Sequence, residues 1–152
     1  MSQKRSALRL VLAAALFASG SAIACAEVIH HGASLSLPAD QLQFGPTGIK
    51  TEAGELMAGP AFGDLSKGQH GTFIKMPAGF VSPIHTHTED YLAVVIKGVG
   101  GNGAVGAADV PLPVGSYWFQ RGEEAHVTKC LSAEECLFFL YQPGKFDYLP
   151  VN

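Results

Sequence analysis

Three histidines have the residue type and the spacing to bind a metal ion. His85 and His87 lie two positions apart, and His126 follows 39 residues after His87. In an extended segment, side chains two positions apart point to the same face, so the first two imidazoles would share a face. Imidazole suits iron, zinc, manganese, copper or nickel, and three such ligands leave coordination positions open for water or a substrate. The pattern alone leaves a second interpretation open, in which these are loop histidines that bind no metal.

The elements that must position these histidines are short strands. The 152-residue chain has the length of one domain, and 47% of it is apolar while 15% is charged. Its 18 glycines and nine prolines favour strands and turns over long helices. Aromatic and β-branched runs predict strands over residues 72–76, 91–97, 116–120 and 136–141. Several strands at this spacing indicate an all-β fold, either an antiparallel barrel or a sandwich.

Two glycine-rich stretches are expected to connect strands. Residues 51–70 predict a long polar loop with one or two strand fragments. Residues 98–103 are typical of a hairpin, with Asn102-Gly103 as the sharpest turn signal.

The other three histidines are weaker ligand candidates. His30 and His31 lie near the start of the expected mature chain, where an exposed terminus is the default. His70 precedes a strand and is expected at the surface.

The N-terminus has the features of a secretory signal. Residues 1–26 combine three positive charges, a short apolar stretch and small residues that form two A-x-A patterns, which predict cleavage after Ala24 or Ala26. The alternative is a lipoprotein whose anchor is Cys25, but Ala22 stands where such sites usually carry Leu. The expected location is therefore periplasmic or secreted, with no membrane span after cleavage. The net charge of −3 and the lack of a basic cluster beyond residue 9 also argue against nucleic-acid binding.

Export changes the interpretation of the two remaining cysteines. Cys130 and Cys136 are separated by five residues, and in an oxidising compartment they predict a disulfide that closes a short loop. A redox-active or metal-binding pair is the alternative, but it calls for closer spacing or a nearby basic group.

The spacing of glycines around the histidines resembles the two motifs of the cupin superfamily. Gly79 precedes His85 by five intervening residues, and Gly98 follows the next expected strand. Gly115, eleven residues before His126, resembles the start of the second motif. The stretches PIHTHT, GSYWFQ and GKFDY are most similar to the DUF4437 group of small exported cupins, which is related to ChrR-like cupins. The resemblance implies a single antiparallel jelly-roll barrel that holds one divalent metal through His85, His87 and His126.

The same resemblance divides the chain. A single domain, residues 27–152, would follow the signal. Residues 27–69 would supply an N-terminal arm and the early strands of the barrel, and residues 70–152 would form the cupin core with both motifs.

Two departures from the cupin motifs affect the site. Cupins usually carry Glu four residues after the second histidine, where this chain has Tyr91. Tyr91 would point inward, either as a packing residue or as a catalytic group that orients a substrate or a metal-bound water. Glu89 shares parity with the histidines and is an alternative fourth ligand, although Thr88-Glu89-Asp90 resembles a tight connection where parity is lost.

The second motif departs as well. Arg121 and Glu123 stand in place of its usual Pro and Gly, which would loosen the loop before His126.

Three functions fit these features. The first is an exported metal-binding cupin that acts on a small molecule, and the resemblance permits a three-His dioxygenase. The second is a non-catalytic cupin that binds or senses a metal or small ligand, and the third is a metal-free structural barrel. An apolar pocket lining is expected from Phe73, Tyr117, Phe119 and Phe138. A homodimer is expected through edge strands or exchange of the N-terminal arm.

Overall fold

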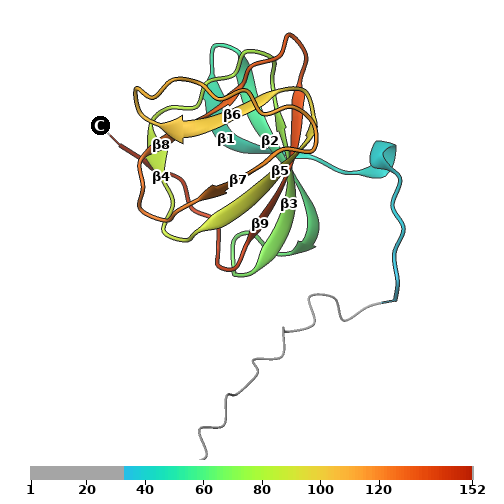
Figure 1. The fold of residues 1–152 in the computed structure, drawn as a ribbon. Helices are drawn as coiled ribbons and strands as arrows, with labels where there is room; N and C mark the ends of the chain where they lie inside the picture. The colour runs from blue at the N-terminus through green and yellow to red at the C-terminus, as the bar shows by residue number, and fades with distance from the viewer. Residues whose placement is uncertain (1–32, 152) are drawn as a thin grey trace, which may run out of the picture.

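Two antiparallel sheets face each other in the computed structural model, which describes residues 33–151 (Figure 1). The larger sheet has six strands in the order β1-β2-β3-β9-β5-β7, and the smaller has four in the order β10-β4-β8-β6. This is the all-β jelly roll that the sequence predicts. The expected signal with both cleavage sites, and Cys25, His30 and His31, lie outside the described residues.

The strand bounds are as follows: β1 Gly45–Thr51, β2 Gly54–Gly63, β3 His70–Met76, β4 His85–Thr86, β5 Tyr91–Lys97, β6 Gly100–Ala104, β7 Tyr117–Gln120, β8 His126–Cys130, β9 Cys136–Gln142 and β10 Leu149–Pro150. A short 3-10 turn, Ala39–Gln41, is the one helical element among residues 33–151. No helix in this part of the chain has the length and apolar character needed to cross a membrane.

Side chains in the central strands alternate between the core and the opposite face of the sheet. In β9, Cys136, Phe138, Leu140 and Gln142 are buried, while the residues between them are half-buried on the opposite face. The four runs predicted from aromatic and β-branched residues correspond to β3, β5, β7 and β9. Strand β9 lies between β3 and β5 in the sheet, so it forms the centre of the larger layer.

The prediction of a long loop over residues 51–70 is wrong for most of its length. Strand β2 occupies ten of these residues and pairs with both β1 and β3. Its glycines serve packing, because a Cβ on Gly59 would lie 2.7 Å from the carbonyl oxygen of Gln43. Gly71 on β3 makes room for the ring of Phe62 in the same way. Glycine composition therefore indicated turns where it marks close contacts within a sheet.

The prediction of a turn at Asn102-Gly103 is also wrong. Asn102 lies in the middle of β6 and pairs with Thr128 of β8. Its side-chain amide donates to Gln120 Oε1 at 2.9 Å, and its oxygen accepts from Thr128 Oγ1 at 2.7 Å. These bonds use the polar side chain to join strands, and the chain turns instead at Gly98, where φ is 79°.

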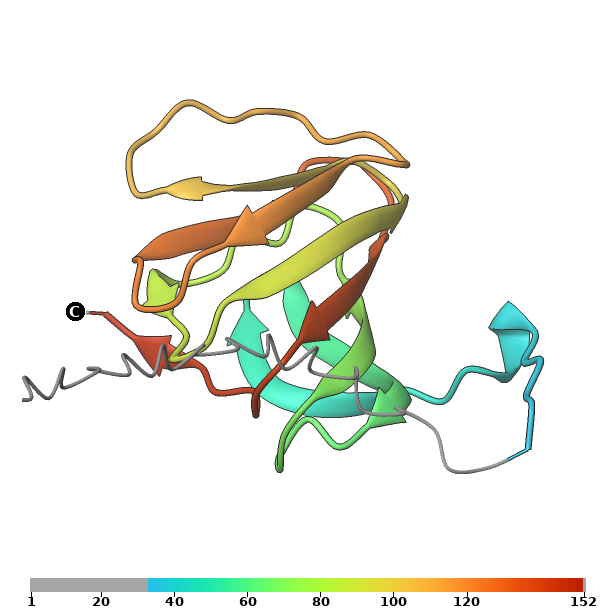
Figure 2. The same ribbon diagram turned by 60° about the horizontal axis from the view of Figure 1, so that its bottom comes forward.

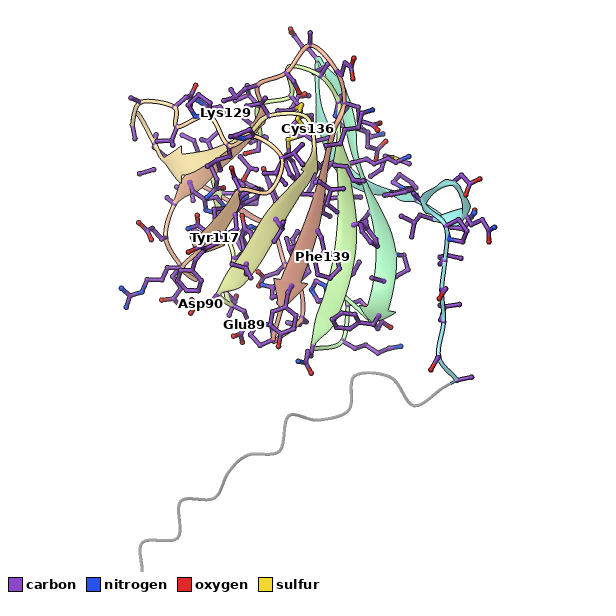
Figure 3. All side chains as sticks on the ribbon, turned by 45° about the vertical axis from the view of Figure 1, so that its right-hand side comes forward. Glu89, Asp90, Tyr117, Lys129, Cys136 and Phe139 are labelled. Atoms are coloured by element: carbon purple, nitrogen blue, oxygen red, sulfur yellow. A yellow bond between two sulfur atoms is a disulfide. The ribbon has the colours of Figure 1, made fainter. Side chains whose placement is uncertain are left out.

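The core lies between the sheets, and a disulfide links them at one end. Buried apolar side chains from both layers meet there, Phe80, Val95 and Phe138 among the most enclosed. The predicted disulfide is present and joins Cys130, the last residue of β8, to Cys136, the first residue of β9. It therefore connects the smaller sheet to the larger one, and Figure 3 shows the sulfur atoms near the label of Cys136.

Candidate metal centre

Three histidines from neighbouring parts of the smaller sheet meet inside the jelly roll. His85 of β4 is the register partner of His126 of β8, and His87 directly follows β4. The ligand atoms that they offer all lie within 4.8 Å of one another. All three side chains are buried, with 1–4% of their surface exposed. The structure thus brings together the three histidines that the sequence predicts as ligands, in an arrangement that could hold a metal ion.

Each of the three rings is oriented by a main-chain carbonyl. The Nδ1–H of His85 donates to the oxygen of Pro83 at 2.9 Å, and that of His126 donates to the oxygen of Glu124 at 2.9 Å. The Nδ1–H of His87 donates to the oxygen of Asp147. A carbonyl can only accept, so each Nδ1 carries the proton and each neutral ring keeps its lone pair on Nε2. Such bonds orient metal-ligating histidines in known metal sites.

Burial keeps the three rings neutral. Desolvation lowers the pKa of His85 to about 4, with smaller contributions from its neighbours His126 and His87. Desolvation also lowers the pKa of His87 and of His126, against the opposing effect of their carbonyl partners. At neutral pH the site therefore offers three uncharged nitrogen donors, which is the donor set that divalent zinc, iron and copper accept.

Tyr91 lies among these histidines. It is the first residue of β5 and is buried, and its hydroxyl lies 3.3 Å from Nε2 of His126. The same oxygen accepts a hydrogen bond from Nε1–H of Trp118 at 3.2 Å. Burial raises the pKa of the phenol to about 12, so Tyr91 is a neutral donor at physiological pH. The position where most cupins carry a glutamate thus holds an uncharged hydroxyl.

Glu89 lies outside the histidine cluster. Its side chain is exposed and packs close to Gly144, and its carbonyl oxygen accepts from Nε2 of Gln142 at 3.2 Å. The connection between β4 and β5 spans only residues 87–90, and the carboxylate of Asp90 anchors it by accepting from the N–H of Gly122 at 2.6 Å. Strand alternation stops after His87, so the parity that Glu89 shares with the histidines does not turn it inward.

The loop before His126 is held in place despite its substitutions. Glu123 is the one non-glycine residue with positive φ among residues 33–151, at 61°. Its N–H donates to the carbonyl oxygen of His87 at 2.7 Å, which ties this loop to the other motif. Glu123 therefore adopts the left-handed conformation that glycine adopts without strain, and the departure from the usual motif does not displace His126.

A C-terminal segment that the sequence did not single out as part of the site covers the histidines. We call residues 143–151 the C-terminal strap. The ring of Tyr148 stacks on His85 with centroids 4.2 Å apart, and Phe146 packs on His87 at 5.2 Å. Strand β10 of the strap pairs with β4, as Figure 2 shows. The signal available in the sequence was the pair of aromatic residues that flank Asp147 after the last long strand.

Asp147 fixes the strap beside His87. Its carboxylate accepts from the main-chain N–H of Thr88 at 2.9 Å and from Thr88 Oγ1 at 2.6 Å. Burial raises the pKa of this carboxyl, but the two bonds from Thr88 outweigh that effect and lower it. The carbonyl oxygen of Asp147 also accepts from His87, so this one residue of the strap holds both His87 and the next residue, Thr88.

The pocket next to the histidines is small and mainly apolar. Its volume is about 60 Å³, and His85, His87 and Tyr91 form its polar end. Phe138 is part of its lining, as predicted. Tyr117 and Phe119 are not, since 66% and 60% of their surfaces are exposed.

The alternation of side chains along the strands explains why three of the four expected lining residues lie outside the pocket. Trp118 is the residue of β7 that reaches the pocket, and its neighbours must therefore point outward. Phe73 packs on Phe139 at 5.3 Å, on the outer face of the larger sheet. Figure 3 labels Tyr117 and Phe139 on this face.

His70 is buried, contrary to expectation, and lies apart from the cluster. Only 1% of its surface is exposed, because it begins β3 on the inward-facing side. Its Nε2 lies 3.3 Å from Oε1 of Gln142, and its Nδ1 lies 2.8 Å from Oγ1 of Thr72. It is a hydrogen-bonded core histidine.

Solved structures confirm the fold and include several enzymes. A DMSP lyase, DddQ from Ruegeria pomeroyi DSS-3, is 17% identical, with a TM-score of 0.58 over 72% of this chain and 61% of its own. An RmlC-like cupin from Ralstonia eutropha JMP134 is 20% identical, with a TM-score of 0.58 over 77% and 73%. The polyketide cyclase RemF from Streptomyces resistomycificus is 15% identical, with a TM-score of 0.62 over 79% and 87%. No curated protein matches the sequence.

A family model gives the more specific assignment. It matches residues 40–152, which include both strand layers, the three histidines and the C-terminal strap. The chain therefore belongs to the cupin-fold family described as a domain of unknown function, DUF4437.

Proposed function

We propose that this protein is an exported, metal-dependent enzyme that acts on a small molecule. The observation that carries the proposal is the set of three Nδ1–H bonds to main-chain carbonyls, which leaves three Nε2 lone pairs close together in a buried site. A core that only needed packing would gain nothing from three neutral histidines in contact. The enzyme names of two structural relatives, a lyase and a cyclase, support a catalytic role for a barrel of this kind.

The reaction class that we propose is an oxidation of the substrate by dioxygen. A divalent ion held by His85, His87 and His126 would supply Lewis acidity and affinity for an anionic, chelating group of the substrate. The three ligands are neutral, so they would leave the charge of the ion uncompensated. In such a reaction, both atoms of dioxygen end in the products of the cleaved or oxidised substrate.

The remaining residues shape the site around the substrate. Tyr91 holds a proton on its hydroxyl, within reach of His126, and is positioned to donate a hydrogen bond to a bound polar group. The rings of Phe146 and Tyr148 cover the histidines and exclude water from them. The apolar lining favours a small substrate with one polar end.

Metal content tests the proposal. The full chain would be produced with its N-terminus, and the processed protein compared with a variant in which His85, His87 and His126 are all alanine. His70→Ala is the matched control, because His70 is equally buried but lies outside the cluster. We expect about one transition metal per chain in the wild type and the control and none in the triple variant. Equal metal in all three proteins would refute the site.

Metal identity then directs the activity test. Iron would lead to oxygen-consumption measurements with diketones and thiols, and consumption that depends on His126 would support the oxidation. Bound metal without turnover of any tested substrate would instead favour a binding or sensing role.

Export is tested on the same material. The disulfide between Cys130 and Cys136 supports an oxidising compartment. The mass of the processed chain would show cleavage after Ala24 or Ala26, or a lipid on Cys25. An uncleaved chain that stays in the cytoplasm would contradict this part of the proposal.

A further inference from the structure

A second cavity lies beside the metal pocket. Its volume is about 310 Å³, and it is bounded by β1, β2 and β3 together with Leu65 and Phe146. The two cavities have four lining residues in common: Leu56, Ile74, Leu140 and Phe146. They are therefore separated by single side chains.

The two volumes differ about fivefold. The pocket at the histidines, about 60 Å³, has room for an ion with a small coordinating group. The second cavity is thus the roomier of the two adjoining spaces, and it could hold the rest of a substrate whose polar end lies at the histidines.

Phe146 differs from the rest of the common wall because it lies outside the strands. Leu56, Ile74 and Leu140 belong to strands β2, β3 and β9, whereas Phe146 lies in the strap outside any strand. Its ring packs on His87, and its main-chain N–H donates to the carbonyl oxygen of Leu65 at 2.7 Å. The backbone is thus fixed while the ring lies between the metal site and the second cavity. A change of its rotamer would join the two spaces.

The second cavity is chemically suited to an apolar group. Its polar side chains already have partners in the protein: Thr47 Oγ1 donates to the carbonyl oxygen of Leu56, and Thr72 pairs with His70. Nε2 of His70 pairs with Gln142. Within residues 33–151, no Asp, Glu, Lys or Arg contributes to its lining. A ligand there would be held by apolar contacts, including those with Pro46, Ala58 and Leu65.

We propose that the second cavity binds the apolar body of the substrate, while the polar head of the same molecule reaches the metal centre past Phe146. The binding of the polar head at the metal rests on the proposed function. The binding of an apolar group in the second cavity does not. Together they assign the substrate class, a molecule with a chelating oxygen group at one end and an unbranched or narrow apolar part of several carbons. Phe146 then determines which apolar parts can pass.

A series of straight-chain carboxylates tests the proposal. Acetate, butyrate, hexanoate and octanoate would be titrated calorimetrically into the processed, zinc-loaded protein. We expect affinity to rise by up to about fourfold per methylene until the cavity is filled. Ala58→Phe, which fills the cavity away from the histidines, should reduce octanoate binding to the level of acetate and leave acetate binding unchanged. Ala53→Phe, in the exposed β1–β2 turn, is the matched control.

A metal-free measurement separates this inference from the proposed function. Hexanol has an apolar chain but no chelating head, and its binding to the metal-free protein would be followed by methyl NMR of Leu65 and Ile74. We expect both signals to shift in the wild type and in the triple histidine variant, but not in Ala58→Phe. Absence of these shifts in the wild type, or carboxylate affinities that do not depend on chain length, would overturn the second cavity as a binding site. Loss of metal binding alone would overturn only the proposed function.

Discussion

The hydroxyl of Tyr91 lies 3.3 Å from Nε2 of His126, the same nitrogen that the Nδ1 bond to Glu124 leaves free. Because Nδ1 of His126 carries the ring proton, Nε2 accepts, and the neutral phenol, whose pKa burial raises to about 12, donates to it. Tyr91 stands where the cupin motif usually has a carboxylate, and His126 is the histidine of the second motif, so this hydrogen bond links the two motifs. Tyr91 therefore occupies the lone pair that a metal would use.

Tyr91→Phe should destabilise the fold and leave the metal content unchanged. The substitution leaves the Nε1–H of Trp118 buried without its acceptor, which costs about 1–3 kcal/mol in the free energy of unfolding. All three histidines remain, so metal binding should persist. Urea unfolding and metal analysis would check both statements. Tyr148→Phe, whose hydroxyl bonds the carbonyl oxygen of Pro83 at the surface, should cost less than 1 kcal/mol by the same measurement. Equal losses in the two variants would contradict the buried bond.

Asp147→Ala should weaken metal binding by about tenfold. Loss of a group that orients a metal-binding histidine typically costs about 10- to 100-fold in metal affinity, and the carbonyl of Asp147 itself remains. Without the carboxylate, the strap loses both bonds to Thr88, so the carbonyl that orients His87 is held less firmly, by the neighbouring main-chain bonds of the strap alone. Zinc affinity in competition with a chromophoric chelator would measure the change. Asp64→Ala is a suitable control, since the carboxylate of Asp64 makes the same two kinds of bond to Ser66, which is not a residue of the strap or of the histidine cluster. An unchanged zinc affinity in Asp147→Ala would show that the strap does not position His87.

Glu123→Gly should stabilise the protein. Glu123 has a positive φ of 61°, a conformation that costs a residue with a side chain about 1 kcal/mol and costs glycine almost nothing. The main-chain bond from its N–H to His87 would be kept. Thermal unfolding should therefore show a rise of a few degrees. Glu124→Gly, at a neighbouring exposed position with negative φ, should lower the midpoint instead, so a fall in both variants would rule out strain at Glu123.

The central strands, the disulfide and the pair His85 and His87 were predictable because each depends on local pattern, whereas His126 joined the predicted site through the resemblance to the second cupin motif. Continuous apolar runs rich in β-branched or aromatic residues mark β5 and β9. The parity of His85 and His87 requires only that the segment be extended. Cys130 and Cys136 are close enough in the sequence for one short loop to bring them together.

Features that depend on distant partners were not predictable in this way. Alternation in β7 shows that Trp118 and Phe119 face opposite sides, but only the position of the second sheet decides that Trp118 faces the pocket. The strap was missed because Asp147 meets His87 across 60 positions of sequence, without a periodic signal. Gly59 falls within the stretch predicted as a loop, because the sequence does not distinguish a glycine in a turn from one that allows a close approach of neighbouring atoms.

Acid should destabilise the metal-free protein well before its carboxylates are protonated. The pKa of His85 falls to about 4 in the folded state, against 6.5 in the unfolded chain, because its ring is desolvated. Above pH 6.5 the ring is neutral in both states and stability is unaffected. Between pH 6.5 and about 4 only the unfolded chain takes up the proton, so stability falls as the pH falls, by about 2 kcal/mol at pH 5 from His85 alone.

Burial also lowers the pKa of His70, His87 and His126, so all four residues act in the same direction. Urea unfolding in the presence of a chelator at pH 7.5, 6 and 5 would measure the loss. A stability that stayed constant or rose over this range would contradict neutral, buried histidines. Saturating zinc should raise stability at pH 7.5 and raise it less at pH 5, because a proton and a metal ion compete for the same Nε2 lone pairs. That pH dependence of the zinc effect would connect the acid sensitivity of the fold to the metal centre.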